Sequence, residues 1–474
     1  MRTTLTATAE KHWMRACVLG LLLVMTPPAF AQSPPPHAAS AETGSPQGAT
    51  DMDEDSSETG QMLRLEEAYH LALSNEEQVK IAAHELVKSE LLPWRAVTLL
   101  TPRAEIGGTF TRNKEEIAFT GAAGSAASTT SVIRPLESWQ GTFVLTQPIF
   151  QPAFFPTLRL GKESVRQSQQ RQEFTKQEVL FGVARAYYDA LRSREQVRVA
   201  RDTLKLTKDE LKQAQARFRV GEVTKTDVLR AEVEVARTER GLIANRNALQ
   251  LAFATLARVV GVPEPLRVAE PTPPVSRGEP YEQLIEHAYG QRQDLRAQAS
   301  AITISRERKN QVLARYAPQI NAQWQYPRLD TPTFANRDEF WVLTLNFQVP
   351  IFDGGVRELD LIEQQENLTQ SELQLERLKK DVGIEVKQTL LAVETLEATL
   401  DTLKKEISLA QENYKITSKQ YGVGLATSLD VNTAVNTLNQ VRTQLIDQTY
   451  AYQVSLLALD RAVGIFGQEY LSQR

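Results

Sequence analysis

One nine-residue motif occurs twice in the sequence, and this repeat constrains the fold more than any other feature. Residues 220–228 read VGEVTKTDV and residues 423–431 read VGLATSLDV, so the two copies are 203 positions apart. The flanking residues keep the same offset, since Phe218 corresponds to Tyr421. A chain that repeats a unit at a fixed distance is expected to build two copies of one structural element.

Each copy of the motif lies between two long segments with heptad patterning. Apolar or small residues alternate spacings of three and four on both sides of each motif. Such a pattern predicts long paired helices. The first helix of each pair would cover about 157–219 or 356–421 and be ~95 Å long at 1.5 Å per residue. The sequence therefore predicts two helical hairpins with their tips at residues 220–227 and 423–430.

Each half also contains two segments in which apolar and polar residues alternate. The residues expected on the apolar, membrane-facing side are Trp139, Phe143, Leu145, Trp324, Tyr326, Trp341, Leu343, Leu345 and Phe347. The alternation predicts β-hairpins over about 102–150 and 318–352, with loops over about 112–138 and 328–338. A half-buried sheet of a soluble protein gives the same pattern. Strand lengths near 9–11 residues, with aromatic residues near the strand ends, favour a membrane β-barrel instead.

Four strands per chain have a consequence for assembly. They are too few to close a barrel, and an open sheet edge is not tolerated in hydrocarbon, where each unpaired N–H or C=O group costs several kcal/mol. The chain is therefore expected to oligomerise, with each copy contributing four strands. On this argument two, three or four copies would serve, and three copies would give twelve strands.

The N-terminal region indicates export from the cytoplasm. Residues 1–31 have the basic start, the short apolar stretch and the Ala-Phe-Ala end of a signal peptide. Residues 32–60 are rich in Ser, Pro and acidic residues and are expected to form a flexible leader. Cys17, the only cysteine, lies in the signal, so the mature chain is expected to lack disulfides and thiolate metal sites. A net charge of −4 with both signs interspersed gives no indication of nucleic-acid binding.

Several short motifs occur in an order that a known family shares. They are QPIF at 147–150, DLRA at 294–297, VPIFDGG at 349–355, AVG at 462–464 and the paired turn motifs. With these residues the chain resembles the TolC family of outer-membrane efflux proteins over about 63–466. The resemblance implies a homotrimer with a twelve-stranded outer-membrane β-barrel, continuous with a long periplasmic α-helical barrel and a small mixed equatorial region.

The expected organisation and partners follow from this resemblance. The order is a first repeat over 61–262, a linker or equatorial region over 263–280, a second repeat over 281–466 and a tail over 467–474. The family acts as the outer-membrane exit duct of tripartite efflux or type I secretion systems. It docks a periplasmic adaptor (membrane fusion) protein and an RND-type or ABC-type inner-membrane pump, which supplies the energy. No cofactor is implied.

The tips are where the resemblance predicts docking of the adaptor. The matching residues are Val220, Gly221, Thr224, Val423, Gly424 and Thr427. A purely structural role explains the same residue types. Glycine after a helix adopts the left-handed conformation without strain, and threonine caps the N-terminus of the next helix. Both interpretations are open on the sequence alone.

The resemblance also predicts a periplasmic gate that involves Asp227, Tyr421 and Asp430. Asp430 matches a position where an acidic ring narrows the entrance and favours cations. Tyr421 and Asp227 match two partners in a tie between the hairpins that keeps the entrance closed. The alternative for both aspartates is stabilisation of the first turn of a helix, worth a few tenths of a kcal/mol.

Two departures from the family pattern predict a looser gate. The arginine of the family's tie is replaced by Ala426, and the second acidic residue of the ring is replaced by Thr433. Lys225 is a candidate replacement for the missing arginine.

The sequence shows no recognisable catalytic or metal site. His37, His70, His84 and His287 lack metal-ligand spacing, and the tip glycines lack the strand context of a nucleotide-binding loop. An enzyme is therefore not expected. The competing hypothesis is a periplasmic coiled-coil scaffold or adaptor without a membrane barrel, which predicts one helical hairpin flanked by small soluble β-domains.

Overall fold

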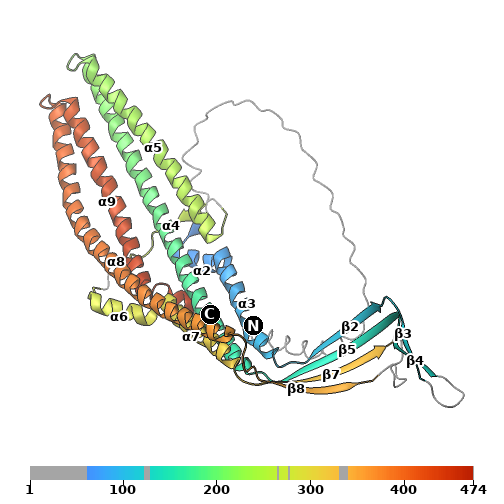
Figure 1. Ribbon diagram of the computed structural model, residues 1–474. Helices are drawn as coiled ribbons and strands as arrows, with labels where there is room; N and C mark the ends of the chain where they lie inside the picture. The colour runs from blue at the N-terminus through green and yellow to red at the C-terminus, as the bar shows by residue number, and fades with distance from the viewer. Residues whose placement is uncertain (1–60, 122–128, 264–265, 276–277, 330–339, 473–474) are drawn as a thin grey trace, which may run out of the picture. The chain divides into compact units, whose positions relative to one another are not determined.

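The computed structural model describes residues 61–121, 129–263, 266–275, 278–329 and 340–472. The predicted signal peptide and leader lie outside these residues, as does most of the second predicted inter-strand loop. Within the described residues the chain forms long helices, one four-stranded sheet and two small strand pairs (Figure 1).

Four long helices form two helical hairpins. They are α4 (Phe154–Arg219), α5 (Lys225–Val260), α8 (Val356–Gly422) and α9 (Ser428–Val463). The first hairpin is α4–α5 and the second hairpin is α8–α9. The helices α4 and α8 have 66 and 67 residues, whereas α5 and α9 have 36 each. At 1.5 Å per residue α4 is about 100 Å long, close to the length that the heptad pattern predicts.

Shorter helices accompany the four long ones, and most of them pack against α4 or α8. They are α2 (Leu65–Asn75), α3 (Glu77–Val97), α6 (Tyr281–Gln291), α7 (Gln293–Ala314) and α10 (Gln468–Ser472). Helix α3 lies against α4, and α7 lies against both α4 and α8. Gln311 of α7 donates to Thr157 of α4 at 2.9 Å, for example. Each repeat thus has a short and a medium-length helix before its strands: α2 and α3 precede β2, and α6 and α7 precede β7.

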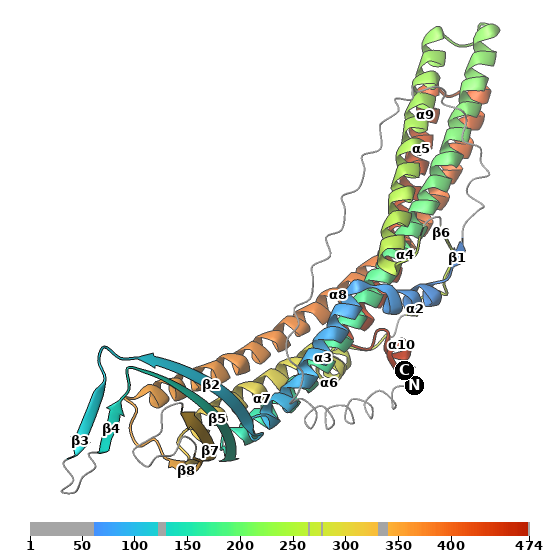
Figure 2. The ribbon, with the colours of Figure 1, turned by 90° about the vertical axis from the view of Figure 1, so that its right-hand side faces the viewer.

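One antiparallel sheet combines the strands of both repeats. Its strands are β2 (Arg103–Arg112), β5 (Glu137–Phe150), β7 (Gln319–Leu329) and β8 (Val342–Gln348), in the order β2-β5-β7-β8. Because β5 leads into α4 and β8 into α8, the sheet lies at the opposite end of these helices from the tips (Figure 2). Strands β2 and β8 form the two edges, and neither has a second partner strand among the described residues.

The loop predicted over 112–138 contains strands, so that prediction was wrong. Within it β3 (Ile117–Gly121) and β4 (Thr129–Arg134) pair antiparallel as a separate ribbon. These strands have five and six residues, which is too short for a sustained alternation of apolar and polar residues to reveal them. The residues that connect them, 122–128, lie outside the described part of the chain.

A second small strand pair joins the two repeats beside the middle of α4. Strand β1 (Gln61–Leu63) pairs in parallel with β6 (Leu266–Val268), which lies in the predicted linker. The hydroxyl of Tyr187 on α4 lies 2.9 Å from the Leu63 carbonyl oxygen and 2.6 Å from that of Ala269. Tyr187 is fully buried, and burial raises its pKa to about 12. The strand pair is thus held against a buried cluster drawn mainly from α2, α4 and α5.

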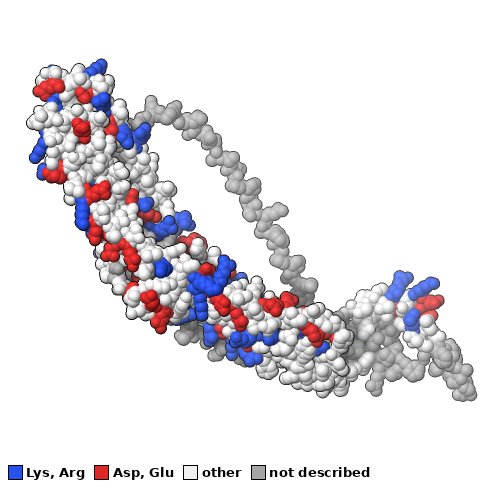
Figure 3. Space-filling model, turned by 60° about the vertical axis from the view of Figure 1, so that its left-hand side comes forward, with Lys and Arg blue, Asp and Glu red and all other residues white. Residues whose placement is uncertain are grey.

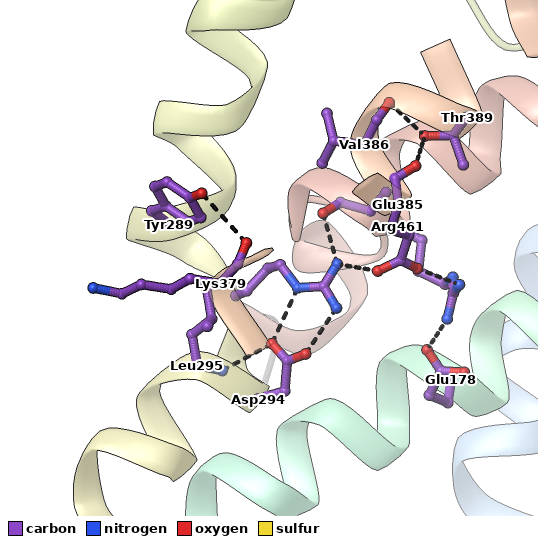
Figure 4. A network of polar contacts seen from close by, with 11 residues as sticks. Glu178, Tyr289, Asp294, Leu295, Lys379, Glu385, Val386, Thr389 and Arg461 are labelled. Carbon is purple, nitrogen blue, oxygen red and sulfur yellow. Dashed lines mark hydrogen bonds and ion pairs between the residues drawn. The ribbon is translucent and has the colours of Figure 1, made fainter. Parts of the chain in front are cut away.

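A network of charged side chains joins α4, α7, α8 and α9 (Figure 4). Arg292, at the start of α7, donates to Asp294 at 2.7 Å and to Glu385 of α8 at 2.6 Å. Arg461 of α9 donates to Glu385 at 2.8 Å and also to Glu178 of α4. Arg292 is buried, and loss of one partner of a buried charge is strongly destabilising. This network therefore fixes how the helices of the two repeats pack together.

Candidate functional site

The two tips have the same backbone geometry. Gly221 and Gly424 both have φ 79°, in the left-handed region. Behind them the chain closes back on the helix, since the Glu222 amide donates to the Arg217 carbonyl at 3.0 Å and the Leu425 amide to the Gln420 carbonyl at 2.8 Å. A residue with a side chain is strained in this conformation, so the glycines have a structural role whatever else they contact.

Each tip continues into a capping box at the start of the next helix. The Asp227 carboxylate accepts from the Thr224 amide at 3.1 Å and from the Thr224 hydroxyl at 2.8 Å. Asp430 accepts from the corresponding groups of Thr427 at 2.8 and 2.7 Å. These bonds satisfy amide groups that the first helical turn leaves unpaired. The two threonines are therefore helix caps, as the structural interpretation of the sequence predicts.

Apolar side chains are exposed at both tips. Val220 is 71% exposed, Val423 is 72% exposed and Leu425 is 80% exposed. Val220 and Val423 are among the predicted docking residues, whereas Leu425 is not. Apolar side chains gathered at an exposed tip suit contact with a partner protein, but their docking role stays a prediction.

The tips of the two hairpins contact each other. The Ser428 hydroxyl of α9 donates to Asp227 of α5 at 2.7 Å. The hydrogen bonds from Ser428 and Thr224 hold the pKa of Asp227 below its ordinary value of 3.8. The guanidinium of Arg217 on α4 lies 4.8 Å from the centre of the Tyr421 ring of α8 and donates to the Tyr421 carbonyl. Two ties therefore join the hairpins at their tips.

These ties differ from the predicted one in their donors. Tyr421 and Asp227 lie at the same interface, but the bond to Asp227 comes from Ser428, and the Tyr421 hydroxyl has no hydrogen-bond partner within the described residues. The arginine that contacts Tyr421 is Arg217 of the first hairpin rather than Lys225, the suggested candidate. Arg217 escaped prediction because its contact joins two residues about 200 positions apart in the sequence.

Asp430 has a different environment from Asp227. Its carboxylate is fully exposed and binds only its own cap, and the Thr427 hydrogen bonds lower its pKa. A lowered pKa keeps Asp430 ionised at neutral pH. The structure thus provides one fixed negative charge on the solvent side of the second tip. Thr433, one turn later, adds no charge there.

The strand register divides the sheet into an apolar face and a polar face. Phe143 lies opposite Tyr326 and Leu145 opposite Trp324, and directly opposed residues in an antiparallel pair lie on the same face. The apolar residues on one face are Ala104, Ile106, Gly108, Phe110, Trp139, Gly141, Phe143, Leu145, Ile320, Ala322, Trp324, Tyr326, Leu343, Leu345 and Phe347. Near the ends of the strands the same face also carries Gln147, Arg328 and the Arg112–Glu137 pair. The predicted strand residues therefore share one face, except that Trp341 lies one residue before β8 begins.

Among the described residues, no helix covers the apolar face. Leu343, Leu345 and Phe347 on the edge strand are 64%, 66% and 67% exposed, and Trp139 is 59% exposed. A half-buried sheet of a soluble protein would cover such side chains with helices. Exposed aliphatic and aromatic side chains of this extent are instead typical of a surface that lies in lipid.

The polar face is rich in side-chain amides and poor in charge. Gln140, Asn321, Gln323, Gln325 and Asn346 lie on it. The charged residues on this face among the described strands are Arg103 and Glu105, both near the start of β2. On the helices, by contrast, charges of both signs are mixed over the face that Figure 3 shows. The sheet and the helices therefore offer chemically different polar surfaces.

The described part of the chain has neither a candidate membrane-spanning helix nor a candidate metal site. No helix there has both the length and the hydropathy to span a membrane. No group of three or more His, Cys, Asp or Glu side chains there is placed to hold a metal ion.

Comparisons with known proteins identify the family. The sequence model described as outer membrane efflux protein matches residues 68–262 and 284–465. The alkaline protease secretion protein AprF of Pseudomonas aeruginosa is 23% identical over 424 residues, covering 86% of this chain and 85% of AprF. The outer membrane protein TolC of Escherichia coli is 22% identical over 342 residues, 69% of each chain. The outer membrane protein VceC of Vibrio cholerae has a crystal structure with TM-score 0.68 and 17% identity, covering 84% of this chain and 96% of VceC. The chain belongs to the outer membrane efflux protein family.

Proposed function

We propose that this outer membrane efflux protein forms, as a homotrimer, the passive exit duct of a tripartite efflux or type I secretion system. The observation that carries the proposal is the four-stranded sheet, which has an exposed apolar face and two unpaired edges. Backbone groups at such edges must be paired in hydrocarbon. Edge β8 of one copy pairing with edge β2 of the next satisfies this requirement, and three copies close a barrel of twelve strands.

In this barrel the apolar face contacts lipid and the polar face lines the lumen. An amide-rich lining with few charges hydrogen-bonds to polar cargo without selecting its charge. This lining fits a duct that passes varied cargo, including unfolded polypeptide. AprF, whose name states a role in protease secretion, covers more of this chain than TolC does. This difference favours protein export as one use of the duct.

The opposite end of the long helices is the proposed entrance in the periplasm. There the exposed Val220, Val423 and Leu425 present an apolar surface to the hairpins of a periplasmic adaptor protein. The adaptor links the duct to an RND-type or ABC-type pump in the inner membrane, which supplies the energy. Asp430 contributes a ring of three negative charges in the trimer, and the ties at Asp227 and Tyr421 hold the entrance narrow.

A pair of charge substitutions on adjacent residues of β8 tests the proposal. Leu345 lies on the apolar face and Thr344 on the polar face. Arginine on the lipid side of a barrel costs about 2–4 kcal/mol at the membrane midplane, whereas the lumen tolerates charge. We expect Leu345→Arg to prevent assembly of outer-membrane trimers and Thr344→Arg to permit it, measured by membrane fractionation, by mass in detergent and by channel recordings in planar bilayers. A soluble monomer, or equal tolerance of both variants, would show that no barrel forms and would favour the periplasmic scaffold.

A further inference from the structure

The first hairpin contains two half-buried glutamates, each with one buried carboxylate oxygen that has no hydrogen-bond partner among the described residues. Glu210 lies on α4 and Glu234 on α5. In each of them the Oε1 atom is inaccessible to solvent and has no hydrogen bond among the described residues. Burial of an ionised carboxylate without a partner is costly, and such a group usually becomes protonated instead.

The helix register places these two residues at the same level of the hairpin. The hydroxyls of Thr207 and Thr238 lie 3.0 Å apart, and Lys208 pairs with Glu239 at 2.9 Å. In an antiparallel pair, one step forward on α4 corresponds to one step back on α5. Position 210 therefore lies opposite positions 235–237, within one turn of Glu234 and one turn nearer the tip than the threonine pair.

The next layer toward the tip provides a contrast within the same hairpin. Arg217 lies seven residues after Glu210 on α4, and Asp227 lies seven residues before Glu234 on α5. A spacing of seven residues keeps both layers on the same face of each helix. In the tip layer Arg217 contacts Tyr421 and Glu222, and Asp227 accepts from Ser428. In that layer both charged groups have hydrogen-bond partners. In the layer of Glu210 and Glu234, by contrast, each carboxylate has one buried oxygen without a hydrogen bond among the described residues.

The groups around the pair come from all four helices. Arg237 of α5 lies 3.7 Å from the Oε2 atom of Glu234, but its side chain is 62% exposed. From α8, Tyr421 has a buried hydroxyl, and its pKa is raised by burial and, to a smaller extent, by the charges of Asp227 and Glu210.

The remaining charged groups lie around Tyr414 of α8. Burial raises the pKa of Tyr414, the charges of Glu210 and Asp209 raise it further, and the charge of Arg442 of α9 lowers it. The cation in contact with the pair is thus Arg237, and it touches Glu234 from the solvent side.

We propose that Glu210 and Glu234 form a proton-binding site whose occupancy keeps the first hairpin closed near its tip. A proton from solvent resides on Glu210, which can then donate to the carboxylate of Glu234 beside Arg237. When the proton leaves, two buried negative charges face each other and the packing of α4 against α5 and α8 weakens. The site itself is a property of the protomer, and its effect on an entrance rests on the proposed function.

The direction of the pH dependence follows from the burial of the pair. Burial, with the charge of Glu234, raises the pKa of Glu210 to about 7 from its ordinary value of 4.5. The stabilisation is therefore fully present below about pH 4.5 and is lost as the pH rises through about 7. With these two values the opening equilibrium of the hairpin increases about tenfold between pH 6 and pH 8.

Hydrogen exchange on the full-length protein in detergent tests this site. The exchange rates of the amides of residues 211–233 are corrected for the intrinsic pH dependence of exchange. The opening equilibrium that they report is expected to be about tenfold larger at pH 8 than at pH 6. In Glu210→Gln, which mimics the protonated group, the difference should disappear. Asp209→Asn is the matched control, because Asp209 is exposed and adjacent in sequence, and it should keep the tenfold difference.

Two other outcomes of the exchange experiment would refute the proposal. If the wild-type difference is absent, the pair carries no titrating proton and the proposal fails. If Glu210→Gln keeps the difference, another group titrates and the proposal also fails. The exchange measurement needs no open pore, so a protein that forms no channel would refute the proposed function and leave this result standing.

Discussion

The two helical hairpins share their tip chemistry and differ in their cores. Both have a left-handed glycine with φ 79° and a Thr–Asp capping box. In the second hairpin the helices meet through buried apolar clusters that include Ala410, Leu438 and Val441. In the first hairpin the positions that match Ala410 and Val441 are Thr207 and Thr238, whose hydroxyls bond each other.

The aromatic residues before the tips show the same contrast. Tyr421 is 5% exposed and packs on Val431 and Val435, whereas its counterpart Phe218 is 44% exposed. The comparison teaches that duplication preserved the local turn while the packing around it diverged. We therefore expect the first hairpin to open at lower free energy than the second, since segments with fewer buried apolar contacts open first.

The largest expected effect is at Tyr421. Tyr421→Ala removes a buried aromatic ring and the contact with Arg217, and such truncations cost about 3–5 kcal/mol. The matched variant Phe218→Ala removes a more exposed ring and should cost less than about 1 kcal/mol. Hydrogen exchange of the amides near each tip would measure both. Equal losses in the two variants would contradict the asymmetry.

A smaller effect is expected at Asp227. Asp227→Asn weakens the hydrogen bond from Ser428, and a bond to a charged group contributes about 1.5–3 kcal/mol. Because the pKa of Asp227 is lowered, its contribution is present above about pH 3.8 and is lost as the pH falls through the lowered pKa. Exchange of the α9 amides between pH 3 and pH 6 would show this loss in the wild type. Asp430→Asn, which removes no bond to the other hairpin, should leave the contact between the hairpins unchanged.

A third variant converts the first core toward the second. The double substitution Thr207→Ala with Thr238→Val installs the residues found at 410 and 441. Replacing both partners of a hydrogen bond with apolar groups is nearly neutral or stabilising, so the first hairpin should gain up to about 1 kcal/mol. Thr207→Ala alone should instead be destabilising. A double-mutant cycle on hairpin opening would reveal the coupling, and a strongly destabilised double variant would refute the comparison.

The smallest effect on stability and the clearest one on conduction is expected at Asp430. Asp430→Ala removes the exposed charge of the second tip, so single-channel conductance should rise and cation selectivity should fall. Thr433→Asp adds a second ring of acids and should have the opposite effect on selectivity. Reversal potentials in planar bilayers measure both variants. Unchanged recordings would show that the narrowest part of the path lies elsewhere.

The long-range architecture could be predicted from local patterns. Heptads on both sides of a Gly-containing turn predict helical hairpins, and alternating residues around Trp139 and Leu343 predict amphipathic strands. These signals succeed because each depends on contacts a few residues apart. The β1–β6 pair was missed because its two strands have three residues each and are about 200 positions apart.

The contacts of Ser428 and Arg217 between the tips could not be predicted from the sequence, because they too join residues far apart in the chain. Ser428 reaches Asp227, and Arg217 reaches Tyr421, only because the two hairpins lie side by side. The distance in sequence is about 200 residues in both cases, and no local pattern fixes how two hairpins approach laterally. One signal was available for the buried pair, since Glu210 and Glu234 are charged residues beside heptad core positions.

The two unpaired strand edges have a consequence for how the protein is made. A free edge beside an exposed apolar face is a template for pairing with any extended chain, so an unassembled protomer is prone to aggregate. Biogenesis must therefore shield the sheet after export and release it only where other copies are within reach. Only the complete assembly, rather than single protomers, would then insert into the membrane. The supply of factors that shield the sheet would limit how many ducts a cell can assemble.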